Sequence, residues 1–477
     1  MSGDSTLERT LRSFAKACGG RLEGADRAFA AVSSDSRTLS PGDLFVALRG
    51  PRFNGNEFVA AALAAGAAGA LVDSLQPLAL AQIVVADTQA ALARAGHAWR
   101  CALDIPVVGV AGSNGKTTAK EMTATILSQA GSCLATRGNL NNHIGVPLTL
   151  LRLEPAHRFA VIEMGANCAG EVAELVKVAR PTVGLITNAG AEHLEGFGSL
   201  EGVARAEGEM VAGLASGATA VLNADDEFVG LWRGMTPAAV TTFGIAKHAD
   251  FRASSLRTTL GAAGFLTRFS LSSPLGRAEI ELHLGGRHNV ANALGAAAAA
   301  AAAGASLEHI VAGLAAVRPV PGRLQLRQAA SGAWIIDDSY NANPSSVRAG
   351  IEVLASVAGR RWLVLGDMAE LGEFAEDAHS QIGAFARERG IERLLATGSL
   401  AARAVEGFGP GGQWFPDTEA LTRELLRSLP SQTLAPPPVA SSGAASVCLL
   451  VKGSRVNRLE RVVGALVGRG NDNSDGH

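Results

Sequence analysis

The stretch that decides the fold is Val107-Val108-Gly109-Val110-Ala111-Gly112-Ser113-Asn114-Gly115-Lys116-Thr117-Thr118. An apolar, β-branched run enters a glycine-rich loop, and a helical pattern follows over residues 119–130. This order predicts a phosphate-binding loop, because the N–H groups of the loop and the helix dipole both attract phosphate. Lys116 is then expected at the β- and γ-phosphates of a nucleotide, and the Thr117 hydroxyl at Mg²⁺. The residues assigned to the nucleotide are Gly112, Ser113, Asn114, Gly115, Lys116, Thr117 and Thr118.

The loop departs from the strict Walker pattern, which has glycine where this chain has Val110. A glycine turn with an incidental lysine is therefore the alternative. We favour the phosphate loop because a strand, Gly-Lys-Thr and a helix coincide here. A nicotinamide-binding site is not supported, because Gly109, Gly112 and Gly115 do not fit Gly-x-Gly-x-x-Gly.

Length and composition limit the number of domains and the compartment of the protein. The chain has 477 residues, which favours two or three domains, and its net charge of −2 gives no basic surface for nucleic acid. Its 5 cysteines include no Cys-x-x-Cys pair, and no signal peptide is visible, so we expect a cytoplasmic protein. The alanine run 296–303 predicts a packed helix and no membrane insertion. The sequence has no heptad repeat that would indicate a coiled-coil oligomer, so we expect a monomer.

Other predicted strands end in polar residues, at the sheet edge where α/β folds bind ligands. Residues 159–163 end in Glu163, which we expect at the same Mg²⁺ as Thr117; a surface glutamate is the alternative. Residues 183–188 lead to His193, which can reach that site, although a loop histidine without a ligand fits the pattern equally well.

The chain divides into three predicted units. Residues 1–86 include a short loop of Ser34, Asp35, Ser36 and Arg37, which suits a sugar or nucleotide diphosphate, although a polar loop with an internal Asp–Arg pair is the simpler interpretation. Residues 87–318 hold the nucleotide loop and antiparallel strands over 240–285. A later helix start there carries Asn289 and Asn292, whose amides either read adenine or cap the helix.

Residues 319–477 form the third unit, which a proline-marked linker opens and in which strands and helices alternate. Residues 430–446 are expected to be mobile and residues 470–477 disordered. The predicted fold class is α/β with three domains: a small α/β N-terminal domain, a central P-loop ATPase-type domain with a mostly parallel sheet, and a C-terminal Rossmann-like doubly wound domain.

Several separated motifs together resemble the Mur ligases of peptidoglycan synthesis, and they cover nearly the whole chain in family order. They are Asp35-Ser36-Arg37, the loop 112–118, Asn141-Asn142, Glu163-Met164-Gly165, Glu192-His193, His288-Asn289, Asp337-Asp338-Ser339-Tyr340-Asn341-Ala342-Asn343-Pro344 and Leu365-Gly366-Asp367-Met368.

The resemblance implies an ATP-dependent ligase that joins D-alanyl-D-alanine to UDP-N-acetylmuramoyl-tripeptide through an acyl phosphate. It implies Lys116 and Arg323 at the ATP phosphates, Asp338 at the ribose, and Asn289 with Asn292 at the adenine. Mg²⁺ would lie at Thr117, Glu163 and His193. The substrate-binding residues would be Ser34, Asp35, Ser36, Arg37, Asn141, Asn142, Tyr340, Asn341 and Asn343.

Two departures from the family pattern stand out. The family commonly has Lys-x-Lys-Gly-Glu, with the second lysine carbamoylated by CO₂, where this chain has Arg205-Ala206-Glu207-Gly208-Glu209. We predict that Glu207 supplies the missing carboxylate to a second Mg²⁺; an uninvolved surface helix is the alternative. The other departure is Asn54-Gly55-Asn56, where Asp-Gly-His is usual, and this weakens any detailed transfer of the UDP site.

Rival functions remain. One is a sibling Mur ligase or a folylpolyglutamate-type ligase, which the runs Asn341-Ala342-Asn343-Pro344 and Gly366-Asp367-Met368 argue against. The other is a nucleotide-dependent switch, which would hydrolyse nucleotide without needing two further substrates.

Overall fold

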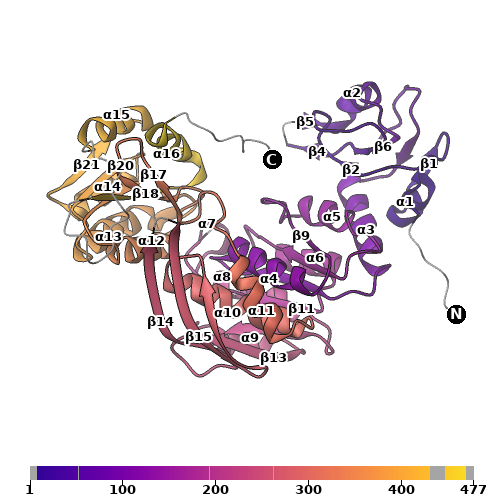
Figure 1. Ribbon diagram of the computed structural model, residues 1–477. Helices are drawn as coiled ribbons and strands as arrows, with labels where there is room; N and C mark the ends of the chain where they lie inside the picture. Colours follow the sequence, from indigo (N-terminus) through magenta and orange to yellow (C-terminus); the bar gives the residue numbers. More distant parts are fainter. Residues whose placement is uncertain (1–7, 52, 193, 262, 430–445, 469–477) are drawn as a thin grey trace.

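The structure is a computed structural model that describes residues 8–51, 53–192, 194–261, 263–429 and 446–468. Three large sheets follow one another along the chain, and Figure 1 shows them as three bodies side by side, from the N-terminal part to the C-terminal part. The α/β fold class is confirmed. His193, residues 430–445 of the expected mobile segment, and the tail 470–477 lie outside the described residues.

The N-terminal sheet has five strands in the order β1-β7-β6-β3-β2, and only β1 pairs antiparallel. A separate two-stranded ribbon, β4–β5, lies beside it. The strands are β1 Arg21–Glu23, β2 Val32–Ser33, β3 Leu44–Val46, β4 Arg49–Gly50, β5 Phe53–Asn54, β6 Gly69–Val72 and β7 Gln82–Val84, and the helices are α1 Leu11–Cys18, η1 Gly55–Phe58 and α2 Val59–Ala64.

The central sheet has nine strands in the order β16-β15-β14-β13-β12-β11-β8-β10-β9. Pairing is parallel from β9 to β14 and antiparallel from β14 to β16. The strands are β8 Val107–Ala111, β9 Cys133–Ala135, β10 Phe159–Glu163, β11 Val183–Ile186, β12 Thr219–Asn223, β13 Ala239–Gly244, β14 Phe251–Gly261, β15 Gly264–Ser273 and β16 Gly276–Leu282.

The prediction of antiparallel strands over 240–285 is therefore wrong for its first strand. β13 pairs parallel with β12, because the helix α9 between them returns the chain to the starting edge of the sheet. The alternation of apolar and polar residues over 278–284, which suggested antiparallel pairing, begins in β16, and β16 does pair antiparallel with β15.

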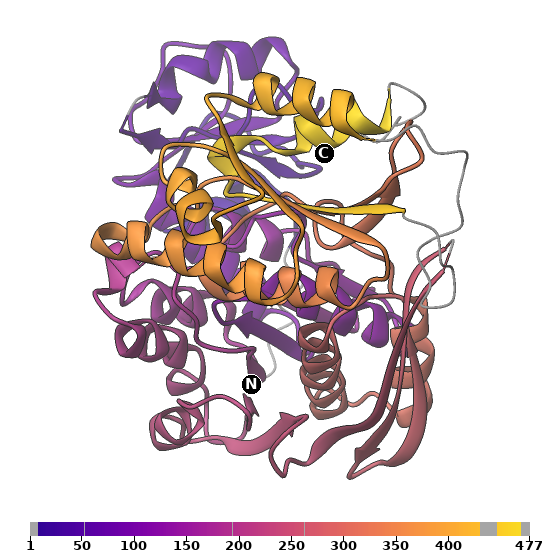
Figure 2. The ribbon, with the colours of Figure 1, turned by 90° about the vertical axis from the view of Figure 1, so that its left-hand side faces the viewer.

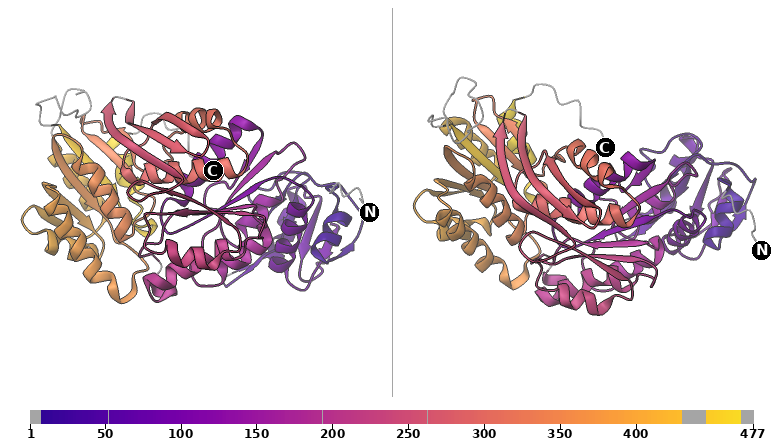
Figure 3. Two further views of the ribbon diagram at one scale, coloured as in Figure 1. Left: turned by 90° about the horizontal axis from the view of Figure 1, so that it is seen from below. Right: turned by 60° about the horizontal axis from the view of Figure 1, so that its bottom comes forward.

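Helices cover both faces of the central sheet, and two cores result (Figure 3). α4, α10 and α11 pack on one face, and α3, α6 and α8 on the other. The alanine run lies in α10, where Ala296, Ala297 and Ala300 are fully buried, so the packed helix is confirmed. In the described ranges no helix is long and apolar enough to cross a membrane. The helices are α3 Thr88–Cys101, α4 Lys116–Ala130, α5 Gly145–Leu150, α6 Glu171–Ala179, α7 Leu194–Phe197, α8 Leu200–Ala212, α9 Val229–Met235, α10 Arg287–Ala302 and α11 Leu307–Ala316.

The C-terminal sheet has six strands in the order β17-β18-β22-β19-β20-β21, parallel except at the edge strand β17. Helices lie on both of its faces, as a doubly wound unit requires (Figure 2). The elements are β17 Gln325–Gln328, β18 Trp334–Asp338, α12 Pro344–Ala355, β19 Arg360–Leu365, η2 Gly372–Phe374, α13 Ala375–Glu388, β20 Arg393–Thr397, α14 Ala401–Phe408, β21 Gly412–Phe415, α15 Thr418–Ser428, β22 Val447–Lys452, η3 Arg455–Asn457 and α16 Glu460–Val467.

Candidate active site

The loop between β8 and α4 needs glycine at two positions. Gly112 has a φ of 121°, and an added Cβ would lie 2.2 Å from the Thr187 hydroxyl oxygen. Gly115 has a φ of 83°, and an added Cβ would lie 2.4 Å from Oδ1 of Asn292. At both positions the positive φ is unfavourable for other residues, and the close contact leaves no room for a side chain.

Three N–H groups of this loop already have protein acceptors. Gly112 donates to Oε2 of Glu207 at 2.6 Å, and Ser113 and Asn114 donate to the backbone oxygen and side-chain oxygen of Asn188 at 2.9 and 3.0 Å. These three N–H groups are therefore not available to phosphate, contrary to the expectation that the whole loop binds it. The free donors that face a ligand are those of the first turn of α4, which begins at Lys116.

Lys116 is folded back on the loop. Its Nζ donates to the backbone oxygens of Gly112 and Ser113 at 2.6 and 3.2 Å, and it lies 3.2 Å from Oε1 of Glu192. Burial lowers the pKa of Lys116, but the surrounding carboxylates of Glu192 and Glu207 outweigh burial and raise it above its ordinary value. Lys116 therefore stays cationic where phosphate would bind.

Glu163 ends β10 with one oxygen bonded and one free. Its Oε1 accepts from Asn141 at 2.8 Å and from the Thr117 hydroxyl at 3.3 Å. Its Oε2 is buried without a hydrogen-bond partner, 3.8 Å from Nζ of Lys120. A buried carboxylate oxygen without a hydrogen-bond donor, beside a hydroxyl, fits a hard divalent cation. The alternative of a surface glutamate is wrong, because Glu163 is 2% exposed.

Glu207 lies on α8 beneath the loop and is buried, so the alternative of a surface helix is also wrong. Burial raises the pKa of its carboxyl to about 7, and Glu192 adds to that effect. Lys116 and the Gly112 N–H oppose it. Among the described residues, no group of three or more His, Cys, Asp and Glu side chains is arranged to hold a metal. The assignment of Glu207 and His193 to Mg²⁺ therefore stays a prediction.

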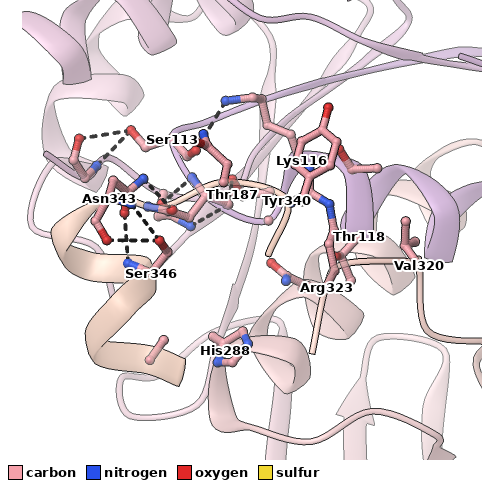
Figure 4. A pocket seen from close by; sticks show the side chains of 18 of the residues that line it. Ser113, Lys116, Thr118, Thr187, His288, Val320, Arg323, Tyr340, Asn343 and Ser346 are labelled. Carbon is pink, nitrogen blue, oxygen red and sulfur yellow. Dashed lines mark hydrogen bonds between the residues drawn. The ribbon is translucent and has the colours of Figure 1, made fainter. Parts of the chain in front are cut away.

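A cavity of about 700 Å³ lies between the central and C-terminal bodies, in front of the loop (Figure 4). The predicted residues that line it are Ser113, Asn114, Gly115, Lys116, Thr117, Thr118, Asn141, Asn142, Glu163, Asn289, Asn292, Arg323, Asp338, Tyr340, Asn341 and Asn343. Gly112 and Glu207 are not among the lining residues.

Side chains of the C-terminal body contact the loop across this cavity. Nη2 of Arg323 donates to the Thr117 hydroxyl at 3.0 Å. Asn343, the N-cap of α12, donates from Nδ2 to Oδ1 of Asn114 at 2.8 Å, and Asn114 donates from its own Nδ2 to the Ser345 hydroxyl at 2.9 Å. Figure 4 shows Asn343 and Arg323 reaching toward the loop. The structure is therefore closed over the nucleotide loop.

Asp338 and the two asparagines of α10 have defined partners. Oδ2 of Asp338 accepts from Nζ of Lys452 at 2.6 Å. Asn289 donates to the backbone oxygen of Gly285 at 2.8 Å, and Asn292 donates to Oδ1 of Asn289 at 3.3 Å. Neither asparagine caps the helix, since no side chain caps α10 at all. The capping alternative is wrong, and adenine recognition stays a prediction.

The predicted diphosphate loop of the N-terminal body is absent from the cavity lining. Arg37 donates from Nε and Nη2 to the two oxygens of Asp35 at 2.9 and 2.7 Å, and this pair holds the pKa of Asp35 at about 2. The simpler interpretation, an internal Asp–Arg pair, is confirmed as a contact. Substrate binding by Ser34, Asp35, Ser36 and Arg37 stays a prediction.

Three residues at the site had no predicted role: Glu192, Ser345 and Lys452. Glu192 precedes His193 in a quoted motif, and Lys452 ends a buried strand, which is the signal that singled out Glu163. Ser345 lies in the first turn of α12, and nothing in its local pattern indicates a contact with Asn114.

Comparisons with known proteins agree along the chain. The catalytic domain of the Mur ligase family matches residues 28–101, the Mur ligase middle domain matches residues 110–300, and the glutamate ligase domain of Mur ligases matches residues 322–434. The UDP-N-acetylmuramoyl-tripeptide–D-alanyl-D-alanine ligase of Escherichia coli K12 is 43% identical over 96% of this chain and 98% of its own length. The Bacillus subtilis enzyme of the same name is 35% identical over 84% of this chain and 88% of its own.

Solved structures give the same result. The chain superimposes on a crystal structure of MurF from Acinetobacter baumannii with a TM-score of 0.88 and 34% identity, covering 96% of this chain and 99% of that one. A structure of MurF ligase from Thermotoga maritima in complex with ADP has a TM-score of 0.78 and 26% identity, covering 91% and 96%.

Proposed function

The chain belongs to the Mur ligase family, and we infer that it is the member that joins D-alanyl-D-alanine to UDP-N-acetylmuramoyl-tripeptide using ATP. The observation that carries this function is the contact between Arg323 and Thr117. It brings a cation of the C-terminal body to the first turn of the nucleotide loop, so the site is assembled from two bodies.

ATP lies along the loop in this proposal. Lys116 and Arg323 neutralise the phosphate charges, and Asn289 with Asn292 faces the adenine. Asp338 binds the ribose hydroxyls while its carboxylate also accepts the hydrogen bond from Lys452. Phosphoryl transfer depends mainly on positioning and charge stabilisation, which these residues supply.

Thr117, Glu163 and His193 would hold one Mg²⁺, Glu207 would help to hold a second, and these ions would add positive charge at the transferring phosphoryl group. The structure supports this assignment through the buried Oε2 of Glu163, which has no hydrogen-bond donor. Glu207 supplies its carboxylate directly, where relatives use a carbamoylated lysine. Added bicarbonate should therefore leave the activity of CO₂-depleted enzyme unchanged, and a recovery on adding bicarbonate would rule this role out.

The reaction proceeds in two steps. A carboxylate of the tripeptide attacks the γ-phosphoryl group, ADP leaves, and an acyl phosphate forms. The amine of D-alanyl-D-alanine then attacks the acyl carbon, loses a proton, and phosphate leaves. Closure of the C-terminal body over the loop keeps water from the acyl phosphate.

The substrate assignments follow the same proposal. Asn141, Asn142, Tyr340, Asn341 and Asn343 line the cavity and contact the two substrates near the reacting groups. Ser34, Asp35, Ser36 and Arg37 bind the UDP part in the N-terminal body. To bind the diphosphate, Arg37 must then break its hydrogen bonds to Asp35 and donate to phosphate oxygens instead.

The organisation proposed for the enzyme is a cytoplasmic monomer of three domains. These are residues 1–86 for the UDP-sugar peptide, 87–318 for ATP and 319–477 for D-alanyl-D-alanine. Sedimentation of the purified chain at micromolar concentration should give a single species of 48.7 kDa. A dimer under these conditions would contradict the monomer.

An omission experiment tests the function. Phosphate release is measured with ATP, UDP-N-acetylmuramoyl-tripeptide and D-alanyl-D-alanine, with each substrate left out in turn. We expect sustained release only with all three, together with formation of the UDP-linked pentapeptide. Release that needs neither cosubstrate would identify a nucleotide switch, and activity with single amino acids in place of the dipeptide would identify a sibling ligase.

A further inference from the structure

Two arginines share one aromatic ring at the rim of the cavity. The ring belongs to Tyr340, the single tyrosine of the sequence. The guanidinium carbon of Arg323 lies 4.5 Å from the centre of its ring, and that of Arg455 lies 5.5 Å from the same centre. Each cation is attracted to the ring, but the two repel each other at this spacing. An anion at either guanidinium would relieve that repulsion.

Arg455 is the arginine with its donors free. Arg323 already donates to Thr117, whereas the guanidinium of Arg455 has no hydrogen bond or ion pair to any described residue. Its side chain is exposed. A guanidinium offers five N–H donors in a planar fork, the geometry that a carboxylate accepts in bidentate fashion.

The backbone beneath Arg455 is fixed. Ser454 donates its N–H to the backbone oxygen of Asp367 at 2.9 Å and its hydroxyl to Oδ1 of Asn457 at 3.1 Å. Arg455 itself is the first residue of the turn η3, three residues after Lys452, which ends β22. A rigid base under a free side chain lowers the cost of ordering it on a ligand.

The spacing of the two arginines suits a dipeptide. In the proposed function, the amine of D-alanyl-D-alanine attacks an acyl phosphate held at Arg323, so the dipeptide must extend away from that point. An extended two-residue chain spans about 7 Å and a single residue about 3.5 Å, and a guanidinium–carboxylate contact adds about 3 Å. The guanidinium carbons of Arg323 and Arg455 are separated by no more than their two distances to the ring taken together. An extended dipeptide with its guanidinium contact covers any separation up to that limit.

We propose that Arg455 binds the C-terminal carboxylate of the incoming dipeptide. This assignment rests on the proposed function and names the residue that recognises the far end of its second substrate. Arg455 contacts the substrate and takes no part in phosphoryl transfer.

The test compares Arg455→Ala with the wild type on two amine substrates, D-alanyl-D-alanine and its C-terminal amide. The wild type should have a KM for the amide about 10- to 100-fold higher than for the acid, the range expected when a charged hydrogen-bonded pair is lost. Arg455→Ala should raise the KM for the acid by a similar factor and should no longer distinguish the two substrates. The KM values for ATP and for UDP-N-acetylmuramoyl-tripeptide should not change.

Arg461→Ala is the matched control, because Arg461 is an exposed arginine of the following helix α16 without a ring contact. It should leave all KM values as in the wild type. Equal KM values of the wild type for acid and amide would overturn the proposal, as would discrimination that survives in Arg455→Ala. Either result leaves the ligase function standing, whereas a wild type that forms no product from the dipeptide would refute that function itself.

Discussion

Replacing Glu207 with glutamine should make the enzyme more stable while impairing it. Glutamine keeps the shape of the side chain and an oxygen that accepts the Gly112 N–H, which now donates to Glu207 at 2.6 Å. What disappears is a buried negative charge. Burial raises the pKa of Glu207 from its ordinary value of 4.5 to about 7, so the ionised form is unfavourable in the folded protein.

The sign follows from proton binding. Between pH 4.5 and about 7 the folded protein holds a proton on Glu207 that the unfolded chain has lost, so stability falls as the pH rises through this range. Above pH 7 the penalty is constant at about 3 kcal/mol, the free energy that corresponds to the difference between the two pKa values. Glu207→Gln should therefore match the wild type below pH 4.5 and exceed it in stability above pH 7.

The assay is thermal unfolding without nucleotide or Mg²⁺, at several pH values from 5 to 8.5. The unfolding temperature of Glu207→Gln should exceed that of the wild type by several degrees at pH 8, and the difference should shrink towards pH 5. Ligase activity should fall, because the proposed Mg²⁺ ligand has lost its charge. Glu201→Gln, at an exposed position in the first turn of α8, controls for loss of a carboxylate from this helix. A difference in unfolding temperature between the wild type and Glu207→Gln that stays constant across this pH range would refute the reasoning.

Three further perturbations test the site. Lys452→Met should destabilise the C-terminal body by about 3 kcal/mol in urea unfolding, because it leaves the half-buried carboxylate of Asp338 without its cation; the double variant with Asp338→Asn should recover part of this loss, and equal losses would contradict the pairing. Ser345→Ala removes one hydrogen bond to Asn114, worth about 1 kcal/mol. Hydrogen exchange at the loop amides should speed up about fivefold if that bond helps to keep the site closed, and unchanged exchange would show that it does not. Burial lowers the pKa of His288 to about 4, so its ring is neutral at pH 7 and its contribution to stability is lost as the pH falls from about 6.5 through 4; the His288 ring signal in NMR should titrate near pH 4, and a midpoint near 6.5 would show that the ring is solvated.

Local patterns predicted much of the site. Lys116, Thr117 and Glu163 were assigned from a strand that ends in a polar residue or a glycine-rich loop, and all three line the cavity. This works because the carboxyl ends of parallel strands share one edge of the sheet. The same logic failed for β13, whose direction depends on the crossover helix before it.

The sequence by itself determined the phosphate loop, the alternation of strands and helices in three units, and the identity of most polar side chains at the strand ends. These features depend on neighbours within a few residues, and such neighbours leave a periodic pattern. Only the tertiary structure decided that Glu207 is buried beneath Gly112, that Glu192 pairs with Lys116, and that Arg455 shares the ring of Tyr340 with Arg323. Each of these contacts joins residues far apart in the chain. Their burial and pKa values arise from packing that brings separate elements together, and no local pattern of residues records that packing.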